Sequence, residues 1–370
     1  MIYRIDIADR DFVKLDEIQD VTSDISWEYT RNGGCGGFSF NVPIKYCREL
    51  TLGLNFNVKI YRKNLDTNAY ELWYQGRIEN KNSVLRGSEE YQTIQGMGYQ
   101  SALKDVDVNR DYSSTELSAI VTSVLDNDVT PNTDIAYSAG DITNTLFTPT
   151  TLNFRHIDAL SVMQTCADLK GSREWGVDRN RNFFFKARST TVNFRYPVSK
   201  KVLNYYLDAT SKELANRVII IGGETGGSPF TATYNDTTSQ LKWGRRDKII
   251  QNSAITTSDV ASQFATAQFA EFSDVVRRGR IELLEETLIE NTTPLGLFRV
   301  IPQLVTYGTM KYGTFLYSGE IDLQINRISY NLDNNGNLRI NMDIGQLRPS
   351  IAEDISQLSA EIDQLATQNL

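Results

Sequence analysis

The sequence has few of the side chains that most often carry out chemistry. It contains one histidine, His156, and three cysteines, Cys35, Cys47 and Cys166, none of which forms a CxxC pair. A single imidazole excludes mechanisms and metal sites that need two, and the cysteine spacing indicates neither a disulfide framework nor a zinc site. Reduced thiols in a cytoplasm fit these counts best.

Long apolar runs are also missing. The longest are short, as in Val218 to Ile221, whereas a membrane-spanning helix needs roughly 18 or more consecutive apolar residues. Residues 1–11 alternate charged with apolar side chains and lack the basic start and apolar middle of a signal peptide. We therefore expect a soluble protein with no stable membrane span and no export through a signal peptide.

The chain has no excess of basic charge. Its 38 lysines and arginines stand against 46 aspartates and glutamates, which gives a formal net charge of −8. A surface that wraps phosphates would carry the opposite sign, so sequence-specific nucleic-acid binding is not expected. With 370 residues, of which 40% are hydrophobic, the chain can bury a sizeable core and is long enough for two to four domains.

Residues 26–43 are the most informative segment. Apolar residues alternate with polar ones on both sides of a glycine-rich stretch: Trp27, Tyr29, Phe38, Phe40 and Val42. This pattern predicts a β-hairpin with one buried aromatic face. The glycines between positions 33 and 37 tolerate positive φ angles, which predicts a sharp turn at the tip of the hairpin.

The remaining periodicity predicts an α+β fold that is mainly β. Short strands with turn signals favour a barrel or a sandwich at each end of the chain, and helical periods lie between them. We expect two antiparallel β-barrel domains, an inserted α/β domain and a short C-terminal helix. The predicted boundaries are 1–107 for the first β domain, 108–200 for the α/β domain, 201–345 for the second β domain with a helical insertion at about 250–275, and 346–370 for the helix.

Two capping patterns predict where helices begin. Ser113 with Glu116 three residues later forms a capping box before an amphipathic run. Thr256 with Asp259 supplies a similar cap for a helix of about residues 258–272.

A loop rich in Thr, Asn and Asp is predicted over residues 126–151, followed by a helix from about Phe154 to Leu169. His156 would then begin this helix, a position where a neutral imidazole commonly caps the helix or packs against it. It is the one candidate for a Ser-His-Asp or Cys-His arrangement, but no nucleophile motif accompanies it.

Other candidate sites have a simpler explanation. Cys35 in the glycine-rich stretch is either an exposed thiol or an incidental loop residue. The acidic residues between Glu282 and Glu286 could serve sugar hydrolysis, but a solvated strand face explains them better. Glycine-rich segments near residues 96 and 222 lack the complete nucleotide-binding patterns, and residues 178–189 lack the glycine and the last carboxylate of a calcium loop. We predict no catalytic, cofactor-binding or metal-binding residues.

Residues 350–365 carry a pattern of self-association. Ser350 and Glu353 form a capping box, and apolar residues then follow at alternating spacings of four and three: Ile351, Ile355, Leu358, Ile362 and Leu365. These residues form a short heptad seam and are the predicted oligomerisation residues. A terminal helix that lies on its own domain is the alternative.

Six short motifs in a fixed order resemble baseplate hub proteins of long-tailed bacteriophages, also called tail-associated proteins. They lie at residues 27–43, 158–169, 174–178, 216–218, 252–256 and 335–339. A short internal echo, in which Gly53-Leu54 precedes Tyr74 as Gly296-Leu297 precedes Tyr317, is consistent with two related β domains or with coincidence.

The resemblance implies a structural protein of the virion tail tip, assembled in the host cytoplasm. Its two barrels would be similar to the tail tube protein, and a homotrimer would join the sixfold tube or distal tail ring to a threefold tip, spike or fibre. The lumen of such a ring passes DNA, and an acidic lumen would repel it. A peripheral receptor-binding protein built on the same domains is the alternative, and a carboxylate-based cell-wall hydrolase is a third hypothesis.

Overall fold

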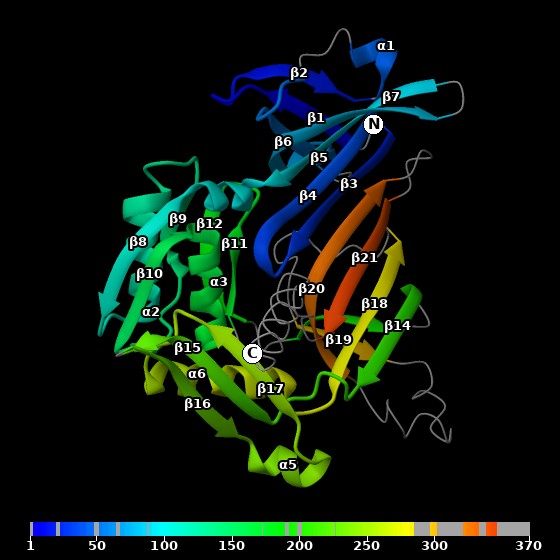
Figure 1. The fold of residues 1–370 in the computed structure, drawn as a ribbon. Coiled ribbons are helices and arrows are strands. Elements are labelled where there is room, and N and C mark those ends of the chain that lie inside the picture. The colour runs from blue at the N-terminus through cyan, green and yellow to red at the C-terminus, as the bar shows by residue number, and fades with distance from the viewer. Residues whose placement is uncertain are drawn as a thin grey trace, which may run out of the picture.

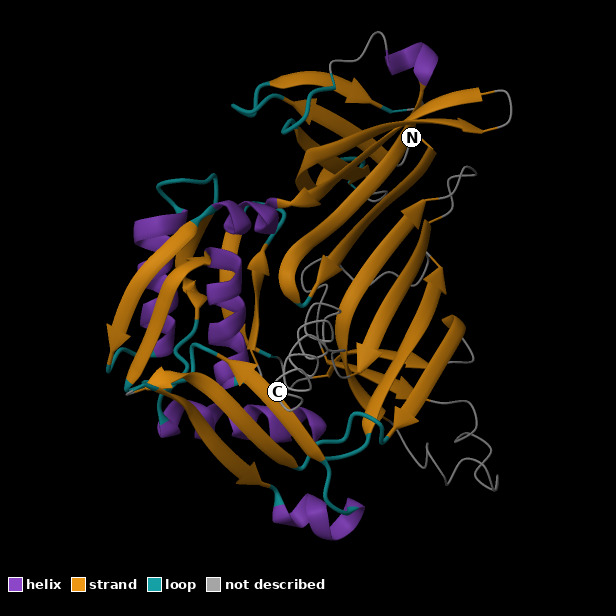
Figure 2. Ribbon diagram, viewed as in Figure 1, coloured by secondary structure: helices purple, strands orange, loops and turns teal. Residues whose placement is uncertain are grey.

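Strands dominate the part of the chain that the computed structural model describes, namely residues 3–19, 23–47, 52–63, 67–86, 89–171, 173–188, 192–197, 202–225, 227–284, 297–301, 321–332 and 338–345. Helices are grouped with a subset of the strands, whereas the described residues around β14, β18, β21 and β20 form strands alone (Figure 2). The prediction of an α+β fold that is mainly β is confirmed.

Within the ranges given above, eleven strands of the main sheet follow one continuous path (Figure 1). In spatial order they are β14 (Val202–Thr210), β18 (Val276–Leu284), β21 (Leu338–Gly345), β20 (Ile321–Leu332), β3 (Ser23–Thr30), β4 (Asn32–Pro43), β7 (Glu89–Gly98), β6 (Tyr70–Arg86), β5 (Asn57–Lys63), β1 (Tyr3–Ala8) and β2 (Lys14–Ile18). Among the described residues this path is open and does not close on itself, so the two barrels stay a prediction.

The other elements branch from this sheet or pack beside it. The branching strands are β11 (Arg173–Val177), β12 (Asn182–Ala187), β9 (Ala136–Ile142), β13 (Val192–Pro197) and β19 (Leu297–Ile301). The two smaller sheets contain β8 (Asp107–Ser113) with β10 (Thr151–Asp158), and β16 (Ser228–Asn235), β15 (Arg217–Thr225) and β17 (Asp247–Asn252). The helices are α1 (Ile44–Cys47), η1 (Tyr99–Asp105), α2 (Leu117–Val124), η2 (Leu125–Val129), α3 (Ala159–Lys170), α5 (Thr237–Trp243) and α6 (Ser258–Phe272).

Two strands far apart in the sequence join the N-terminal and C-terminal β regions. β3 and β20 pair antiparallel, with Trp27 opposite Tyr330. Their rings stack with centroids 5.2 Å apart and an interplanar angle of 8°. Because aromatic side chains bury a large apolar area, this contact fixes the seam between the two β regions within one sheet.

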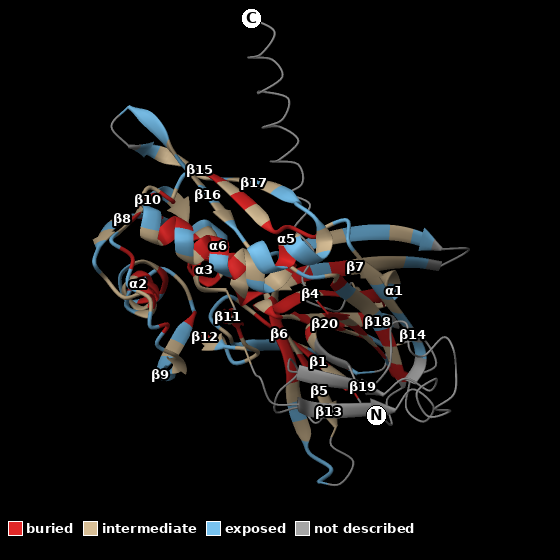
Figure 3. Ribbon diagram, turned by 90° about the horizontal axis from the view of Figure 1, so that it is seen from below, coloured by how far each residue is buried: buried red, intermediate tan, exposed pale blue. Residues whose placement is uncertain are grey.

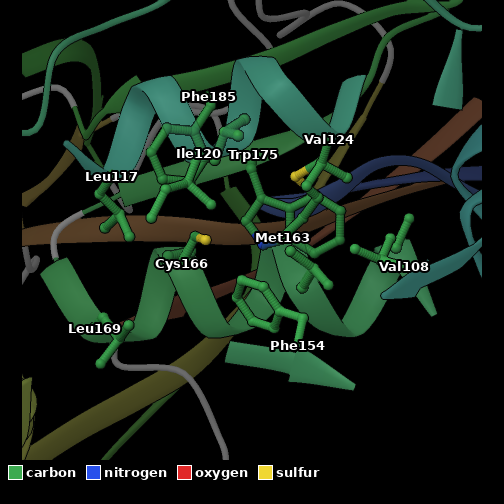
Figure 4. Packing of buried hydrophobic residues seen from close by; sticks show 14 of the residues in the cluster. Val108, Leu117, Ile120, Val124, Phe154, Met163, Cys166, Leu169, Trp175 and Phe185 are labelled. Atoms are coloured by element: carbon green, nitrogen blue, oxygen red, sulfur yellow. The ribbon is translucent and has the colours of Figure 1, made fainter. Parts of the chain in front are cut away.

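The interior is divided into two large hydrophobic cores. The first lies against the main sheet and contains Trp27, Phe40 and Met342, among others. The second lies between α2, α3 and the strands beside them, and Figure 4 shows Phe154, Trp175 and their neighbours packed in it. Buried residues are frequent along β4, β11 and α3, the elements near which the two cores meet (Figure 3).

The second core draws on two separate stretches of the chain. Besides residues 99–185 it contains Val218, Ile220 and Ile255, together with residues of α6. This packing groups the β15–β17 sheet and α6 with the α/β region instead of with β18, β20 and β21. The predicted domain boundaries at residues 107, 200 and 345 stay a prediction.

The hairpin predicted in residues 26–43 is confirmed as β3 and β4, but its glycines are not in its turn. β3 ends at Thr30 and β4 begins at Asn32, so Arg31 stands at the turn. Gly33 and Gly34, with φ angles of 121° and 82°, lie inside β4. The prediction of a glycine-rich loop at the tip was therefore wrong, and these glycines serve a contact with β11 that is described below.

The first capping box was also misplaced. Ser113 is the last residue of β8, and the N-cap of α2 is Glu116, whose carboxylate accepts hydrogen bonds from the amides of Ser118 at 2.8 Å and Ala119 at 3.2 Å. A glutamate that caps its own helix replaces the predicted serine because β8 continues to Ser113, where it pairs with Thr151.

The region before α3 contains more strand than expected. The predicted loop over residues 126–151 contains η2 and β9, and the predicted helix from Phe154 begins only at Ala159, after β10. Asp158 caps α3 by accepting a hydrogen bond from the Ser161 amide at 2.9 Å. Pairing of β10 with β8 overrides the helical period here, so His156 lies in a strand and not at a helix start.

The later elements agree more closely with the predictions. The strands near residues 174–185, the helix at 258–272 and the strands of the last hairpin are confirmed as β11, β12, α6, β20 and β21. The N-cap of α6 is Thr257, however, and not Thr256. Asp259 accepts hydrogen bonds from the amide and hydroxyl of Thr150, at 2.8 and 2.9 Å, and so fastens α6 to the start of β10.

Candidate assembly surface

The predicted oligomerisation residues Ile351, Ile355, Leu358, Ile362 and Leu365 lie outside the described residues. So do the turn of the last hairpin and Tyr317 of the internal echo. The heptad seam therefore stays a prediction.

His156 is exposed on β10 and has two polar neighbours. Its Nδ1 lies 3.0 Å from Oδ2 of Asp107, and its Nε2 lies 3.3 Å from the amide nitrogen of Asn109. In a Ser-His-Asp arrangement the nitrogen opposite the carboxylate faces a nucleophile. Here it faces an amide, so this histidine and carboxylate make a surface contact between β8 and β10.

The cysteines are placed for packing. Cys35 and Cys166 are fully buried, and this burial raises the pKa of both thiols. Burial also raises the pKa of the half-buried Cys47. Thiolates carry the reactivity of cysteine, so these environments disfavour it. The exposed thiol that the glycine-rich stretch suggested for Cys35 was wrong.

Carboxylates of the acidic stretch form cross-strand pairs where they are described. Glu282 on β18 lies 3.2 Å from the Arg339 guanidinium and accepts a hydrogen bond from Asn204 at 2.7 Å. Among the residues described, no group of three or more potential ligands could hold a metal ion. Within the same part of the chain, no helix is long and apolar enough to cross a membrane.

An extended polar arrangement lies on the side of the main sheet that faces away from the first core. Side chains of a strand point alternately to opposite faces, so Arg280 and Glu282 flank the buried Ile281. We call this side the polar face and define it by the following residues: Asn204, Tyr206, Arg280, Glu282, Arg339, Asn341, Asp343, Arg327, Ser329, Glu28, Ser39, Asn41, Thr93 and Gln95.

A row of alternating charges crosses four strands of the polar face. Arg280 of β18 lies 3.0 Å from Asp343 of β21, and Arg327 of β20 lies 2.8 Å from the other oxygen of the same carboxylate. Arg327 in turn lies 3.5 Å from Glu28 of β3. Glu28 accepts a hydrogen bond from the Gly37 amide of β4 at 3.3 Å, which ends the row.

Gly36 makes room for this last carboxylate. A Cβ atom at Gly36 would stand 2.7 Å from Cγ of Glu28. The glycine therefore lets the glutamate side chain lie flat over β4, within reach of the Gly37 amide and of Arg327. The β4 glycines are thus needed on a strand surface and not in a turn.

The polar face continues over β4 and β7 with uncharged partners. Asn41 donates a hydrogen bond to Asp24 at 2.8 Å and accepts one from the Thr93 hydroxyl at 2.7 Å. Ser39 stands opposite Gln95 in the β4–β7 register. Across the described strands, this face therefore combines paired charges on one half with amides and hydroxyls on the other.

A second feature joins the two cores. β4 and β11 pair in parallel, with Trp175 opposite Asn32, Gly176 opposite Gly33 and Val177 opposite Gly34. A Cβ atom at Gly34 would stand 2.2 Å from the Val177 carbonyl oxygen. These glycines allow the two backbones to approach closely, which is why β4 needs them where it meets the α/β region.

A buried arginine lies at the same junction. Arg31 is 1% exposed, and its Nε and Nη2 atoms have no hydrogen-bond partner within the described part of the chain. Burial lowers its pKa to about 9, and burial raises the pKa of the carboxyl of Glu174 on β11. Trp175 pairs with Asn32, and the residues that precede them are Glu174 and Arg31. These two opposite charges are therefore neighbours at the junction.

Comparison with known proteins identifies the fold. No protein-family model and no curated protein matches the sequence. Among solved structures, the 43 kDa tail protein of prophage MuSo2 from Shewanella oneidensis has a TM-score of 0.63 at 12% identity, covering 93% of this chain and 97% of that one. The chain has the fold of phage tail proteins.

Two further structures agree with this assignment. A tail protein from Neisseria meningitidis MC58 has a TM-score of 0.62 at 9% identity, with 94% of this chain and 97% of that chain covered. Prophage tail protein gp18 from Listeria monocytogenes EGD-e has a TM-score of 0.60 at 13% identity, with coverage of 98% and 100%. The resemblance to phage tail proteins inferred from the ordered motifs is confirmed at the level of the fold.

Sequence reasoning missed the charge row of this phage tail fold. Two of its residues occupy a polar position between two apolar ones, Glu28 between Trp27 and Tyr29 and Asp343 between Met342 and Ile344. That alternation was visible and could have marked the face. The pairing was not, because Arg327 and Glu28 lie 299 positions apart in the chain.

Proposed function

We propose that this chain is a non-enzymatic structural component of a phage tail tip, a homotrimeric baseplate hub. The observation that carries the proposal is the full-length similarity to phage tail proteins, which extends over 93% to 98% of this chain and 97% to 100% of the three solved structures. A match over both β regions and the α/β region is stronger support than a match over one domain.

The continuous sheet supports a ring. Because β3 pairs with β20, each chain presents its two β regions side by side in one sheet. Three chains around an axis would present six such regions, which suits the junction between a sixfold tail tube and a threefold tip. In this proposal each β region is a barrel of the tail-tube type.

The proposed partners are the tail tube or distal tail protein on one side of the ring and a tip, spike or fibre protein on the other. DNA would pass through the lumen without sequence-specific contacts. The protein would be assembled in the host cytoplasm and reside at the tail tip or baseplate of the virion.

The environments of the reactive side chains favour a structural role over catalysis. His156 faces Asp107 and Asn109, and the thiols of Cys35 and Cys166 are buried. Glu282 is held by Arg339 and Asn204. A cell-wall hydrolase would need two carboxylates that flank an open substrate site. Reproducible release of sugar from purified peptidoglycan, abolished by Glu282→Gln, would overturn the non-enzymatic role.

Light scattering on the purified protein at several concentrations tests self-association. We expect a trimer that is weakened when Ile355 and Ile362 are both replaced by aspartate, because charges at heptad a positions disrupt the seam. Ala360→Asp, at the outer f position of the same heptad, is the matched control. Equal trimer stability in both variants would show that these residues do not hold the chains together.

The position of the protein in the virion tests the hub directly. A label on this chain should appear on the tail axis at the tip, with a copy number that is a multiple of three. Lateral copies around the baseplate would instead identify a peripheral receptor-binding protein and overturn the hub.

A further inference from the structure

The arginines of the charge row are held between carboxylates. Asp343 lies within 3.0 Å of both Arg280 and Arg327, and Arg327 also contacts Glu28. A second group on the same face repeats this arrangement, because Glu282 lies 3.2 Å from Arg339 and is hydrogen-bonded by Asn204. These arginines therefore have their positive charge compensated within the sheet.

Stability explains little of this arrangement. The paired side chains are partly exposed, with 58% of the Arg280 and 41% of the Arg327 side chain accessible. Exposed ion pairs contribute little to folding because water screens them. On β4 and β7 the same face carries amides and hydroxyls, so a stable sheet does not require charged side chains on this face.

The chemistry of the polar face disfavours two kinds of lasting contact. A protein partner that covered this face would have to remove water from several paired charges, which is costly. A polyanion would find each of these arginines already occupied by a carboxylate, so few phosphates could be neutralised and few counterions released. Such a surface is suited to a charged polymer that must slide past without being held.

We propose that the polar face is the surface along which double-stranded DNA passes, and that Asp343, Glu28 and Glu282 keep its arginines from holding the phosphates. This inference rests on the proposed function as a hub with a DNA channel. It differs from the expectation of a uniformly acidic lumen, because on this face compensation of charge, and not an excess of negative charge, prevents adhesion.

Asp343→Asn tests the inference, with Asp247→Asn as a matched control. Asp247 also bridges two arginines, lying 2.7 Å from Arg245 and 2.9 Å from Arg217, but on the separate sheet of β15 and β17. Each substitution removes one carboxylate from beside two guanidinium groups, although Arg327 keeps its weaker contact with Glu28 at 3.5 Å. In both purified variants, binding of a short DNA duplex should rise over the wild type and fall roughly tenfold between 50 and 200 mM salt.

The two variants should differ only in assembled particles. We expect severalfold slower DNA release from Asp343→Asn particles, followed with a DNA-binding dye after heating, and wild-type release from Asp247→Asn particles. The delay should shrink as salt screens the freed arginines. If Asp343→Asn fails to assemble, Glu282→Gln, which frees Arg339 on the same face, takes its place.

The possible failures can be told apart. Unchanged release from the Asp343→Asn particles, or an equal delay in both variants, would overturn the assignment of the polar face. If the labelled chain still lay on the tail axis, the hub would stand and only this inference would fall. A lateral label would overturn the hub itself.

Discussion

Gly176 of β11 lies so close to Gly34 of β4 that a Cβ atom on Gly176 would stand 2.2 Å from the Gly34 amide nitrogen. No side chain fits between two backbones at this distance. The parallel pairing of β4 with β11 therefore depends on glycine at this position, and this pairing connects the main sheet to the α/β region.

Replacing Gly176 by alanine should push the two strands apart. We expect a loss of about 3 kcal/mol in the free energy of unfolding, at the upper end of the cost of overpacking, because the clash is with backbone that cannot rotate away. Urea unfolding followed by tryptophan fluorescence measures it. Gly140→Ala is the control, since nothing lies within 4 Å of a Cβ atom there and its φ angle is not positive. Equal stability of the two variants would contradict the close approach.

Arg31→Met should stabilise the free protein. Arg31 is buried with two nitrogens that have no hydrogen-bond partner among the described residues, and leaving buried donors unsatisfied costs about 1 to 3 kcal/mol, a cost that methionine avoids. Glu174 loses its neighbouring opposite charge in this variant, but its raised pKa lets the carboxyl take up a proton instead. Thermal and urea unfolding measure the change. The same substitution at Arg245, which is exposed, should have little effect. A clear loss of stability in Arg31→Met would mean that the guanidinium has a partner that stabilises the fold.

Glu174→Gln should make stability less dependent on pH. Burial raises the pKa of Glu174 above its ordinary value of 4.5, so the folded protein binds the proton more tightly than the unfolded chain. The contribution of Glu174 to stability is then greatest below pH 4.5 and is lost as the pH rises through its folded-state pKa. The variant should therefore be more stable than the wild type at pH 7, and the difference should vanish below pH 4.5. Unfolding curves of both proteins across this pH range test the prediction. A difference in stability that does not change with pH would contradict the raised pKa of Glu174.

Glu116 should matter more than Ser113 to helix α2. Its carboxylate caps the helix and also accepts a hydrogen bond from the Thr145 amide at 2.8 Å. Removing an N-cap costs about 1 to 2 kcal/mol, so Glu116→Ala should lower stability by at least this amount. Ser113→Ala tests the capping box that the sequence suggested, and we expect a change below about 0.5 kcal/mol. A larger loss of stability in Ser113→Ala than in Glu116→Ala would identify Ser113 as the cap of α2.

Local patterns predicted the elements better than their boundaries. Alternation around Trp27 and Phe38 identified the hairpin, and the period of residues 258–272 identified α6, because both signals arise from residues close in the chain. The turn of the hairpin was misplaced because glycine has two uses, positive φ and close backbone approach, and the second depends on β11 far along the sequence. His156 was misplaced for a similar reason, since pairing of β10 with β8 outweighed the helical period.

The candidate surface was less predictable than the fold. Ser329, Glu28 and Arg327 occupy polar strand positions that any exposed sheet would show. Only the register of β20 against β3 brings Arg327 to Glu28, and no local pattern encodes a pairing over almost 300 positions. Positive and negative charges balance on one face only once the strands have paired. The net charge of −8 for the whole chain therefore did not predict how charge is distributed on this face.

The pairing of β3 with β20 has a consequence for synthesis on the ribosome. β20 is made almost 300 residues after β3, so one edge of β3, with Trp27 beside it, stays unpaired until this length of chain has emerged. Loop closure over such a distance is slow, and an open strand edge attracts other chains meanwhile. In the proposed ring, copies that associate early would therefore meet each other through an unfinished sheet, so each chain would have to complete its sheet before it joins the others.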